Sequence, residues 1–344
     1  MNALLIGFGA AIFLIAWFLC LLFSKPSSIF YVLDEVTNRS LHNEPKPRTG
    51  GVAIVSTIIL GWLVIILVMK DEMFHYTVMI GVMILSVVSY LDDRKSMSKI
   101  WRLFVHSIAA FLMVFSVFGY SGDAINNSVV IENWLVVYIF AVLTSMWCIN
   151  LYNFMDGMDG LAGGMGVIGF SCLAWFGWSA GHQFYFLLAC VVAASNFGFL
   201  LHNYPPAKIF MGDVGSTVMG YLVAFLSLWG GLENIFSWWV PLLVFSPFFV
   251  DATTTLARRC YLGERFWEAH KTHFYQKLVQ IGLGHAKTVV LEYVLMFSVA
   301  CTAVMLHLAD SNLLTMIVLG TWLIIYLCII GSINYLVIKS RVMG

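Results

Sequence analysis

Charge is scarce in this sequence. Asp, Glu, Lys and Arg make up only 10% of its 344 residues, and their formal charges cancel to zero. Without a basic excess, a nucleic-acid partner is not expected. Hydrophobic residues reach 61%, which is more apolar surface than a soluble protein of this length could bury. The composition therefore predicts a protein whose outer face is solvated by the lipid bilayer.

Features that would divide or process the chain are also lacking. No linker, repeat or low-complexity tract interrupts it, so we expect a single transmembrane domain over residues 1–344. The seven cysteines do not have the spacing of a metal site and are interpreted as small core residues. The apolar run 3–23 follows no basic segment and precedes no clear cleavage site, which predicts a retained helix.

Long apolar runs predict an all-α polytopic fold with about 11 transmembrane helices. The candidate spans are 3–23, 50–69, 76–91, 103–120, 133–150, 161–180, 183–202, 214–231, 236–256, 288–307 and 313–336.

The connections between these spans differ sharply in charge. Of the 18 Lys and Arg residues, only Lys70 lies outside one alternating set of connections. By the positive-inside rule this basic set is cytoplasmic, which places the N-terminus in the periplasm and the C-terminus in the cytoplasm. The set comprises 24–49, 92–102, 151–160, 203–213, 257–287 and the tail 337–344.

The stretch NLYNFMDGMDG concentrates polar side chains next to apolar runs. Asn150, Asn153, Asp156 and Asp159 recur every three residues, which would place them on one face of a helix. Oxygen ligands of this kind suit Mg²⁺, which shares its shell with substrate phosphates and water. Tight helix packing would explain the glycines of the stretch but not its acids.

Two other cytoplasmic stretches contain charges beside a helix end. In NEPKPRTGG, Lys46 and Arg48 precede a helix N-terminus, a place that favours anions, although they could be only a positive-inside flank. In YLDDRKSMSKIWR, the adjacent Asp92 and Asp93 need a cation or a basic partner. A structural salt bridge to nearby Arg or Lys is an equal alternative for this pair.

Two further stretches of the predicted cytoplasmic connections contain candidate site residues. In HNYPPAKIFMGDVGS, Asp213 begins a span and could be a simple helix N-cap, but Asn203 and Phe210 favour a structured loop. The segment ARRCYLGERFWEAHKTHFYQKL contains His270 and His273 without a third zinc ligand, and could instead be an interfacial amphipathic segment. The five stretches combine acids and amides that suit a hard metal with basic residues that suit phosphate, and they lie next to a bilayer. This combination favours phosphoryl transfer to or from a lipid.

These five motifs, in the order they have along the chain from residue 43 to about 285, resemble those of the polyprenyl-phosphate N-acetylhexosamine-1-phosphate transferases, the MraY/WecA-like glycosyltransferase 4 family. The resemblance implies transfer of N-acetylhexosamine-1-phosphate from a UDP-sugar to undecaprenyl phosphate, with release of UMP. It also implies Mg²⁺, with Mn²⁺ as the alternative ion, a bacterial inner-membrane location, a site facing the cytoplasm and a homodimer as a candidate assembly.

The resemblance also assigns roles to the acids and amides. Asp213 and Asn153 are expected to bind the metal, with Asp156 near the phosphates. Asp92, with Asp93 beside it, is the candidate to orient or deprotonate the lipid phosphate. Direct attack by that phosphate is favoured, because its second pKa is about 6 and it is already largely ionised. A two-step route through an aspartyl-phosphate stays open.

The remaining positions are expected to bind substrate. Asp159, Asn203 and Phe210 match the uridine pocket, where Phe210 would stack on uracil. Lys46 and Arg48 are expected to bind an anionic part of the substrate, and His270 and His273, with Arg265, are expected to meet the diphosphate or the sugar. The candidate catalytic residues are Asp92, Asp93, Asp156, His270 and His273.

The sugar is less constrained. HKTHFYQK replaces the run of histidines found in the translocase branch, so a peptidoglycan substrate is not expected. The segment is more similar to the WecA/WbpL-like enzymes that start O-antigen chains, which leaves GlcNAc, GalNAc, FucNAc and QuiNAc open.

Rival classes fit the sequence less well. A UbiA-type prenyltransferase would need two DDxxD motifs, and a CDP-alcohol phosphotransferase would need an Ala-Arg pair after its first Asp-Gly. A transporter would place ionisable residues near the middle of its spans, whereas here nearly all acids lie at cytoplasmic helix ends.

Overall fold

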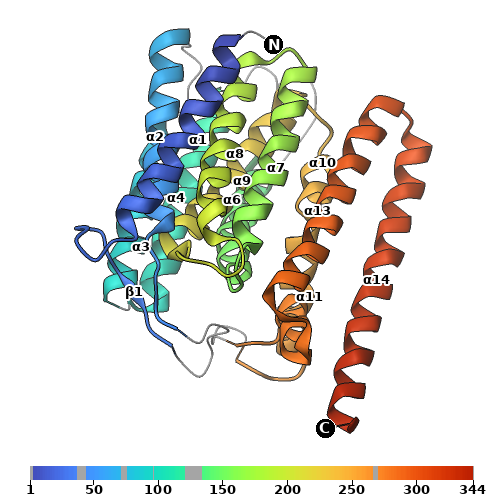
Figure 1. The fold of residues 1–344 in the computed structure, drawn as a ribbon. Coiled ribbons are helices and arrows are strands. Elements are labelled where there is room, and N and C mark those ends of the chain that lie inside the picture. The colour runs from blue at the N-terminus through green and yellow to red at the C-terminus, as the bar shows by residue number, and fades with distance from the viewer. Residues whose placement is uncertain are drawn as a thin grey trace.

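The computed structural model describes residues 3–36, 44–70, 76–95, 97–120, 134–265 and 270–343, and this part of the chain is almost entirely helical (Figure 1). Ten helical segments among these residues are long and apolar enough to cross a membrane. The N- and C-termini lie at opposite ends of the bundle (Figure 1). The predicted all-α polytopic fold is confirmed.

The helices follow the predicted runs closely. In the N-terminal half they are α1 (Ala3–Phe23), α2 (Gly50–Met69), α3 (Tyr76–Arg94), α4 (Lys99–Tyr120), α6 (Trp134–Met155) and α7 (Leu161–Ser179). In the C-terminal half they are α8 (Gln183–Asn203), α9 (Gly212–Leu232), α10 (Trp239–Val244), α11 (Ser246–Tyr261), α12 (Phe274–Leu278), a π-helical turn (Val279–Leu283), α13 (Gly284–Ala309) and α14 (Asn312–Met343).

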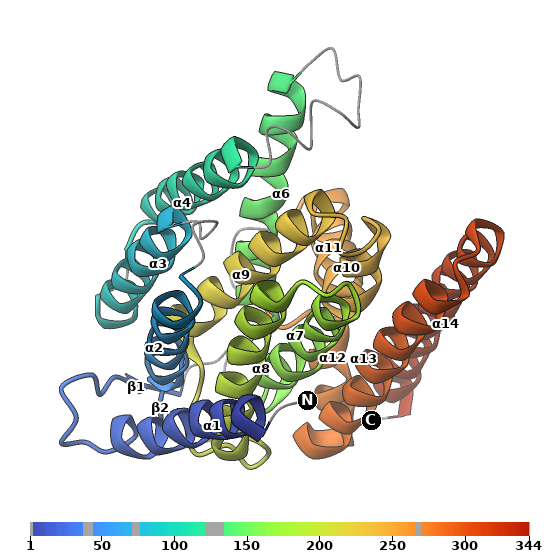
Figure 2. The same ribbon diagram turned by 90° about the horizontal axis from the view of Figure 1, so that it is seen from above.

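Helix α9 occupies the centre of the bundle. It packs against α2, α3 and α6, and nearly all of its side chains are buried. The view along the bundle in Figure 2 shows α1 and α14 at its periphery, where they expose most of their apolar side chains. An apolar helix is stable in either place, because protein or lipid surrounds it on all sides. The N-terminal end of α9 is thereby held among the ends of its neighbours.

The predicted span 236–256 is not one continuous helix. It is divided into α10 and α11, which meet at Phe245. Pro247 lies in the first turn of α11, where its missing N–H is tolerated but could not continue the hydrogen-bond ladder of α10. Neither α10 nor α11 is among the ten segments of the described chain that are long and apolar enough to cross a membrane.

Close backbone contact joins the first turns of α2 and α9. A Cβ atom added to Gly51 would lie 2.1 Å from the backbone nitrogen of Gly215. The backbone N–H groups of Gly50 and Gly51 donate to the carbonyls of Phe210 and Met211, at 2.9 and 2.8 Å. The start of α2 thus holds the loop that precedes α9, and only glycine permits this approach.

A short β ribbon lies before α2. Strand β1 (Leu33–Asp34) pairs antiparallel with β2 (Lys46–Pro47). The N–H of Phe210 donates to the carbonyl of Pro47 at 2.8 Å, so the ribbon lies beside the same loop.

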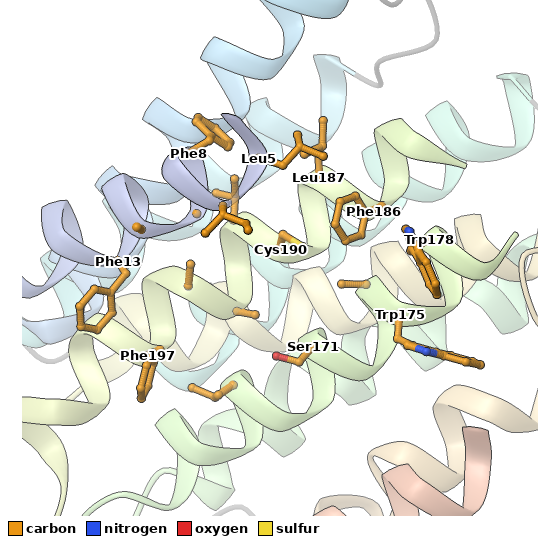
Figure 3. Close-up of a pocket in the computed structure, with 18 residues that line it drawn as sticks. Leu5, Phe8, Phe13, Ser171, Trp175, Trp178, Phe186, Leu187, Cys190 and Phe197 are labelled. Atoms are coloured by element: carbon orange, nitrogen blue, oxygen red, sulfur yellow. The ribbon is translucent and has the colours of Figure 1, made fainter. Parts of the chain in front are cut away.

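An apolar groove of about 880 Å³ opens among α1, α7 and α8 (Figure 3). Aromatic side chains such as Phe13, Phe197 and Trp178 line it. Its composition matches the lipid chains that surround a membrane protein, and its polar content is too small for a reaction site.

Replacement of Gly51 by alanine is expected to destabilise the protein. The new methyl group would meet the rigid backbone of α9, and such overpacking costs about 1–3 kcal/mol. The matched control is Gly320→Ala on α14, where an added Cβ meets nothing within 4 Å. Thermal unfolding of the detergent-purified variants should give a lower midpoint for Gly51→Ala only. Equal midpoints would contradict the close-contact interpretation.

Candidate active site

Polar ends of four helices meet at one face of the bundle. Arg102, in the first turn of α4, lies between two carboxylates from other helices. Its Nη1 atom is 2.9 Å from Asp92 Oδ2 on α3 and 3.3 Å from Asp213 Oδ2 on α9. Asn153, near the end of α6, donates through Nδ2 to Asp213 Oδ1 at 3.0 Å and to Ser216 Oγ at 2.8 Å. The structure therefore brings together residues predicted from three separate motifs.

Asp93 lies beside Asp92 but has a different arginine partner. Arg48 Nε is 3.4 Å from Asp93 Oδ1, the Arg48 guanidinium also donates to the Asp93 carbonyl, and Arg48 Nη1 is 3.6 Å from Asp34 Oδ1. The salt-bridge alternative for the aspartate pair is thus confirmed: Asp92 pairs with Arg102 of its own motif, and Asp93 pairs with Arg48 of another motif. Arg94, the nearest basic residue in sequence, instead donates to the carbonyl of Ile29 at 2.7 Å.

Asp213 lies inside the first turn of α9 and is not its N-cap. The N-cap position belongs to Met211, and Asp213 is the acidic residue of the first turn. A carboxylate there is stabilised by the positive end of the helix dipole. The N-cap alternative is therefore wrong, and the Asp213 carboxylate is directed to Arg102 and Asn153.

Asp156 follows the end of α6 in the turn that leads to α7. The predicted helical face is correct for Asn150 and Asn153 only, because α6 ends at Met155. Burial raises the pKa of Asp156 to about 8, and the negative charges of Asp213 and Asp34 contribute to the rise. A bound cation would oppose this shift, since it stabilises the ionised carboxylate.

We call Asp92, Asp93, Asp156 and Asp213 the carboxylate cluster. The donor types in and around it, carboxylate and amide oxygens, are those that Mg²⁺ prefers. Asp93 Oδ2 is buried and has no hydrogen-bond partner in the described part of the chain. No three His, Cys, Asp or Glu side chains among the described residues converge closely enough to enclose an ion by themselves. Mg²⁺ usually takes only one or two carboxylates and completes its shell with phosphate and water, so the cluster fits this ion.

Asp159 and Asn203 organise the loop before α9. Asp159 Oδ2 accepts from the N–H of Ala207 at 3.0 Å, and Asp159 Oδ1 is 3.3 Å from His285 Nδ1. Asn203 accepts from the N–H of Gly160 at 2.9 Å and donates to the carbonyl of Ile209 at 2.8 Å. Burial opposes ionisation of Asp159, but hydrogen bonds from His285 and Ala207 hold its pKa below the ordinary value. Their predicted contact with uridine stays a prediction.

Phe210 is the half-buried aromatic residue of this loop. Lys46 Nζ lies 5.5 Å from its ring centroid, within the range of a cation–π contact. The two residues are 164 positions apart in the sequence and come from motifs that are joined by the β2–loop hydrogen bond. A flat apolar surface beside a cation can receive a base and its attached phosphate.

The histidine segment is organised by a residue that the sequence did not single out. Asp251, on α11, accepts from His273 Nδ1 at 2.9 Å and from the N–H groups of Phe274 and Tyr275, both at 3.1 Å. Thr255 donates to the same carboxylate at 3.0 Å. Asp251 thus fixes both the His273 ring and the start of α12. Its position in an apolar span was the available signal, because a carboxylate there is costly without a role.

His270 and His273 lie together, and α12 reaches toward the carboxylate cluster. The two imidazole centroids are 4.9 Å apart, and burial lowers the pKa of His270 to about 4. Tyr275 OH donates to the carbonyl of Phe154, next to the Asp156 turn, at 3.4 Å. Arg265 is exposed at the edge of the described residues, and residues 266–269 lie outside them.

Sequence comparisons relate the chain to known proteins. The profile of Glycosyl transferase family 4 matches residues 75–231. A "Probable undecaprenyl-phosphate N-acetylglucosaminyl 1-phosphate transferase" of Bacillus subtilis is 32% identical over 310 residues, which cover 89% of this chain and 85% of the relative. A "Decaprenyl-phosphate N-acetylglucosaminephosphotransferase" of Mycobacterium leprae is 28% identical over 74% of this chain and 72% of its own.

A more distant relative broadens the comparison. A "Phospho-N-acetylmuramoyl-pentapeptide-transferase" of Streptococcus sanguinis is 26% identical over 75% of this chain and 84% of its own. The helical membrane architecture and these matches confirm the predicted family: the chain is a multi-pass membrane protein that belongs to glycosyl transferase family 4.

Proposed function

We propose that this protein transfers N-acetylhexosamine-1-phosphate from a UDP-sugar to undecaprenyl phosphate and releases UMP. The observation that carries the proposal is the convergence of Asp92 and Asp213 on Arg102 at the helix ends, with Asn153 hydrogen-bonded to Asp213. The names of the Bacillus and Mycobacterium relatives support a polyprenyl phosphate as acceptor and a sugar-1-phosphate as the transferred group. Family membership argues against the prenyltransferase and transporter alternatives.

The proposed reaction is a direct displacement. A non-bridging oxygen of the lipid phosphate forms a bond to the β-phosphorus of the UDP-sugar. The bond from that phosphorus to the oxygen shared with the α-phosphate breaks, and this oxygen leaves with UMP. The attacking phosphate is a monoester with a second pKa of about 6, so it is largely ionised at neutral pH and needs little help from a base.

The residues of the cluster would position the two substrates. Asp213 and Asn153 would hold Mg²⁺, which when bound neutralises charge on the diphosphate. Arg48 and Arg102 now compensate carboxylates, and each guanidinium can exchange such a partner for a phosphate oxygen. Asp92 would orient the lipid phosphate, and Asp93 would lie beside it. Phe210 and Lys46 would bind the uridine end of the donor.

The site is proposed to face the cytoplasm of a bacterial inner membrane. Seventeen of the 18 Lys and Arg residues lie in the connections on that side, since only Lys70 lies elsewhere. A soluble nucleotide sugar is made and held in the cytoplasm, while the lipid acceptor stays in the bilayer. We infer that the reaction starts O-antigen or another cell-envelope polysaccharide.

The direct test is UMP release. Purified protein is incubated with undecaprenyl phosphate, Mg²⁺ and one donor at a time from UDP-GlcNAc, UDP-GalNAc, UDP-FucNAc and UDP-QuiNAc. The proposal expects UMP from at least one donor, dependent on the lipid and abolished by EDTA. Failure of all four donors with folded protein would contradict it.

Replacement of Asp251 by asparagine is expected to impair catalysis although this residue lies outside the carboxylate cluster. The change removes the charged acceptor of His273 and of two backbone N–H groups. A hydrogen bond to a charged group contributes about 1.5–3 kcal/mol, so kcat/KM should fall about 10- to 100-fold.

The matched control for that variant is Asp310→Asn, an exposed carboxylate after α13. UMP release should be measured well below the unfolding temperature of each variant. Full activity of Asp251→Asn, or an equal loss of activity in Asp310→Asn, would contradict the role of Asp251 in catalysis.

A further inference from the structure

Helix α13 presents one face to the turn that contains Asp159. His285, Val289 and Tyr293 are spaced four residues apart, so their side chains lie on the same side of the helix. Tyr293 OH donates to the carbonyl of Gly160 at 2.7 Å, and a Cβ atom added to Gly160 would lie 3.2 Å from Val289 Cγ2. This part of α13 is thus packed against the turn, which fixes the place of His285 relative to Asp159.

His285 is the more accessible member of its pair with Asp159. Its side chain is 20% exposed, against 7% for Asp159, and its buried Nδ1 atom lies 3.3 Å from Asp159 Oδ1. The other carboxylate oxygen, Oδ2, accepts from the N–H of Ala207 at 3.0 Å. Both carboxylate oxygens therefore have a neighbour within the protein, and most of the exposed surface of the pair belongs to His285.

The carboxylate of Asp159 also selects the tautomer of His285. An ionised carboxylate only accepts hydrogen bonds, so the Nδ1 atom that faces it carries the proton. A neutral imidazole with its proton on Nδ1 keeps a lone pair on Nε2. No described residue hydrogen-bonds to this Nε2 atom, which leaves an oriented acceptor for a ligand.

The surface proposed for uracil adjoins this pair. Burial opposes ionisation of Asp159, and the charge of Lys46 is one of the influences that lower its pKa. The same ammonium group lies 5.5 Å from the centroid of the Phe210 ring. Strand β2, the loop before α9, the turn after α6 and the start of α13 are thereby brought together.

We propose that His285 is a uridine-binding residue, whose ring is oriented by Asp159 and whose Nε2 atom accepts a hydrogen bond from N3–H of uracil. The inference rests on the proposed function and adds a residue that determines its specificity. The N3 atom of cytosine is itself an acceptor, so a cytosine nucleotide would leave two lone pairs facing each other. Asp159 would then act on the base through His285.

The test exchanges His285 for each of the two amides. Asparagine has its polar atoms at the position of Nδ1, and glutamine has them near the position of Nε2. His285→Asn can keep the contact with Asp159 but loses the acceptor for uracil, so it should bind UMP about 3- to 10-fold more weakly. His285→Gln should keep the affinity for UMP within about twofold of the wild type.

The measurement is isothermal titration calorimetry of UMP and CMP into the purified full-length protein with Mg²⁺, which needs no turnover. In His285→Asn the preference for UMP over CMP should fall by the same factor as the affinity for UMP. The matched control is His307→Asn, a half-buried histidine at the other end of α13, which should match the wild type.

The two amides separate a contact with the base from simple support of Asp159. Unchanged UMP affinity of His285→Asn, an equal loss in His285→Asn and His285→Gln, or an unchanged preference for UMP over CMP would each overturn the inference. Absence of UMP binding to the wild type would overturn it together with the proposed function. The expected affinities without UMP release from any donor would support the inference and contradict the transfer reaction alone.

Discussion

The ion pairs of Arg48 and Arg102 with aspartates are the interactions on which the site depends. Asp92, Asp93, Asp156 and Asp213 lie at helix ends in an apolar bundle, where like charges repel strongly. The two guanidinium groups offset part of that repulsion. The four carboxylates outnumber the two arginines, and Asp34 adds a further carboxylate beside Arg48. The excess negative charge favours a divalent cation, and phosphates can then replace the carboxylates as partners of the arginines.

This arrangement can exist only because the backbones approach closely around it. The contact of Gly51 with Gly215 brings the start of α2 onto the start of α9. The same contact holds the loop with Phe210, through the carbonyls of Phe210 and Met211. A side chain at either glycine would separate Arg48 from the α9 end. Apolar helices in the membrane thus form the bundle, and the glycines determine how closely the polar helix ends approach one another.

Sequence patterns predicted the elements and most of the polar residues of this site. Spans follow from apolar runs, while the side of the membrane inferred from the basic loops stays a prediction. Long-range partners were not predictable in the same way. Asp251 is 22 positions from His273 and lies in an apolar run, so only the fold shows that they pair. Arg102 was visible only as a local partner of the aspartate pair, and its contact with Asp213 spans 111 positions.

Helix ends were the other source of error. The triplet spacing of polar residues suggested a helix through Asp159, but α6 ends at Met155 and the two aspartates belong to a turn. Likewise, apolar content alone gives no sign that 236–256 is interrupted at Phe245. In both cases a proline or a glycine-rich turn overrides the periodicity.

The central claim is that the carboxylate cluster holds a divalent ion together with the diphosphate of the donor. Mn²⁺, a paramagnetic substitute for Mg²⁺, can be titrated into purified protein and followed by electron paramagnetic resonance, with and without UDP-GlcNAc. The account predicts that the nucleotide sugar strengthens Mn²⁺ binding and that Asp213→Asn removes this effect. Mn²⁺ binding that is unchanged by the donor, or retained in full by Asp213→Asn, would contradict it.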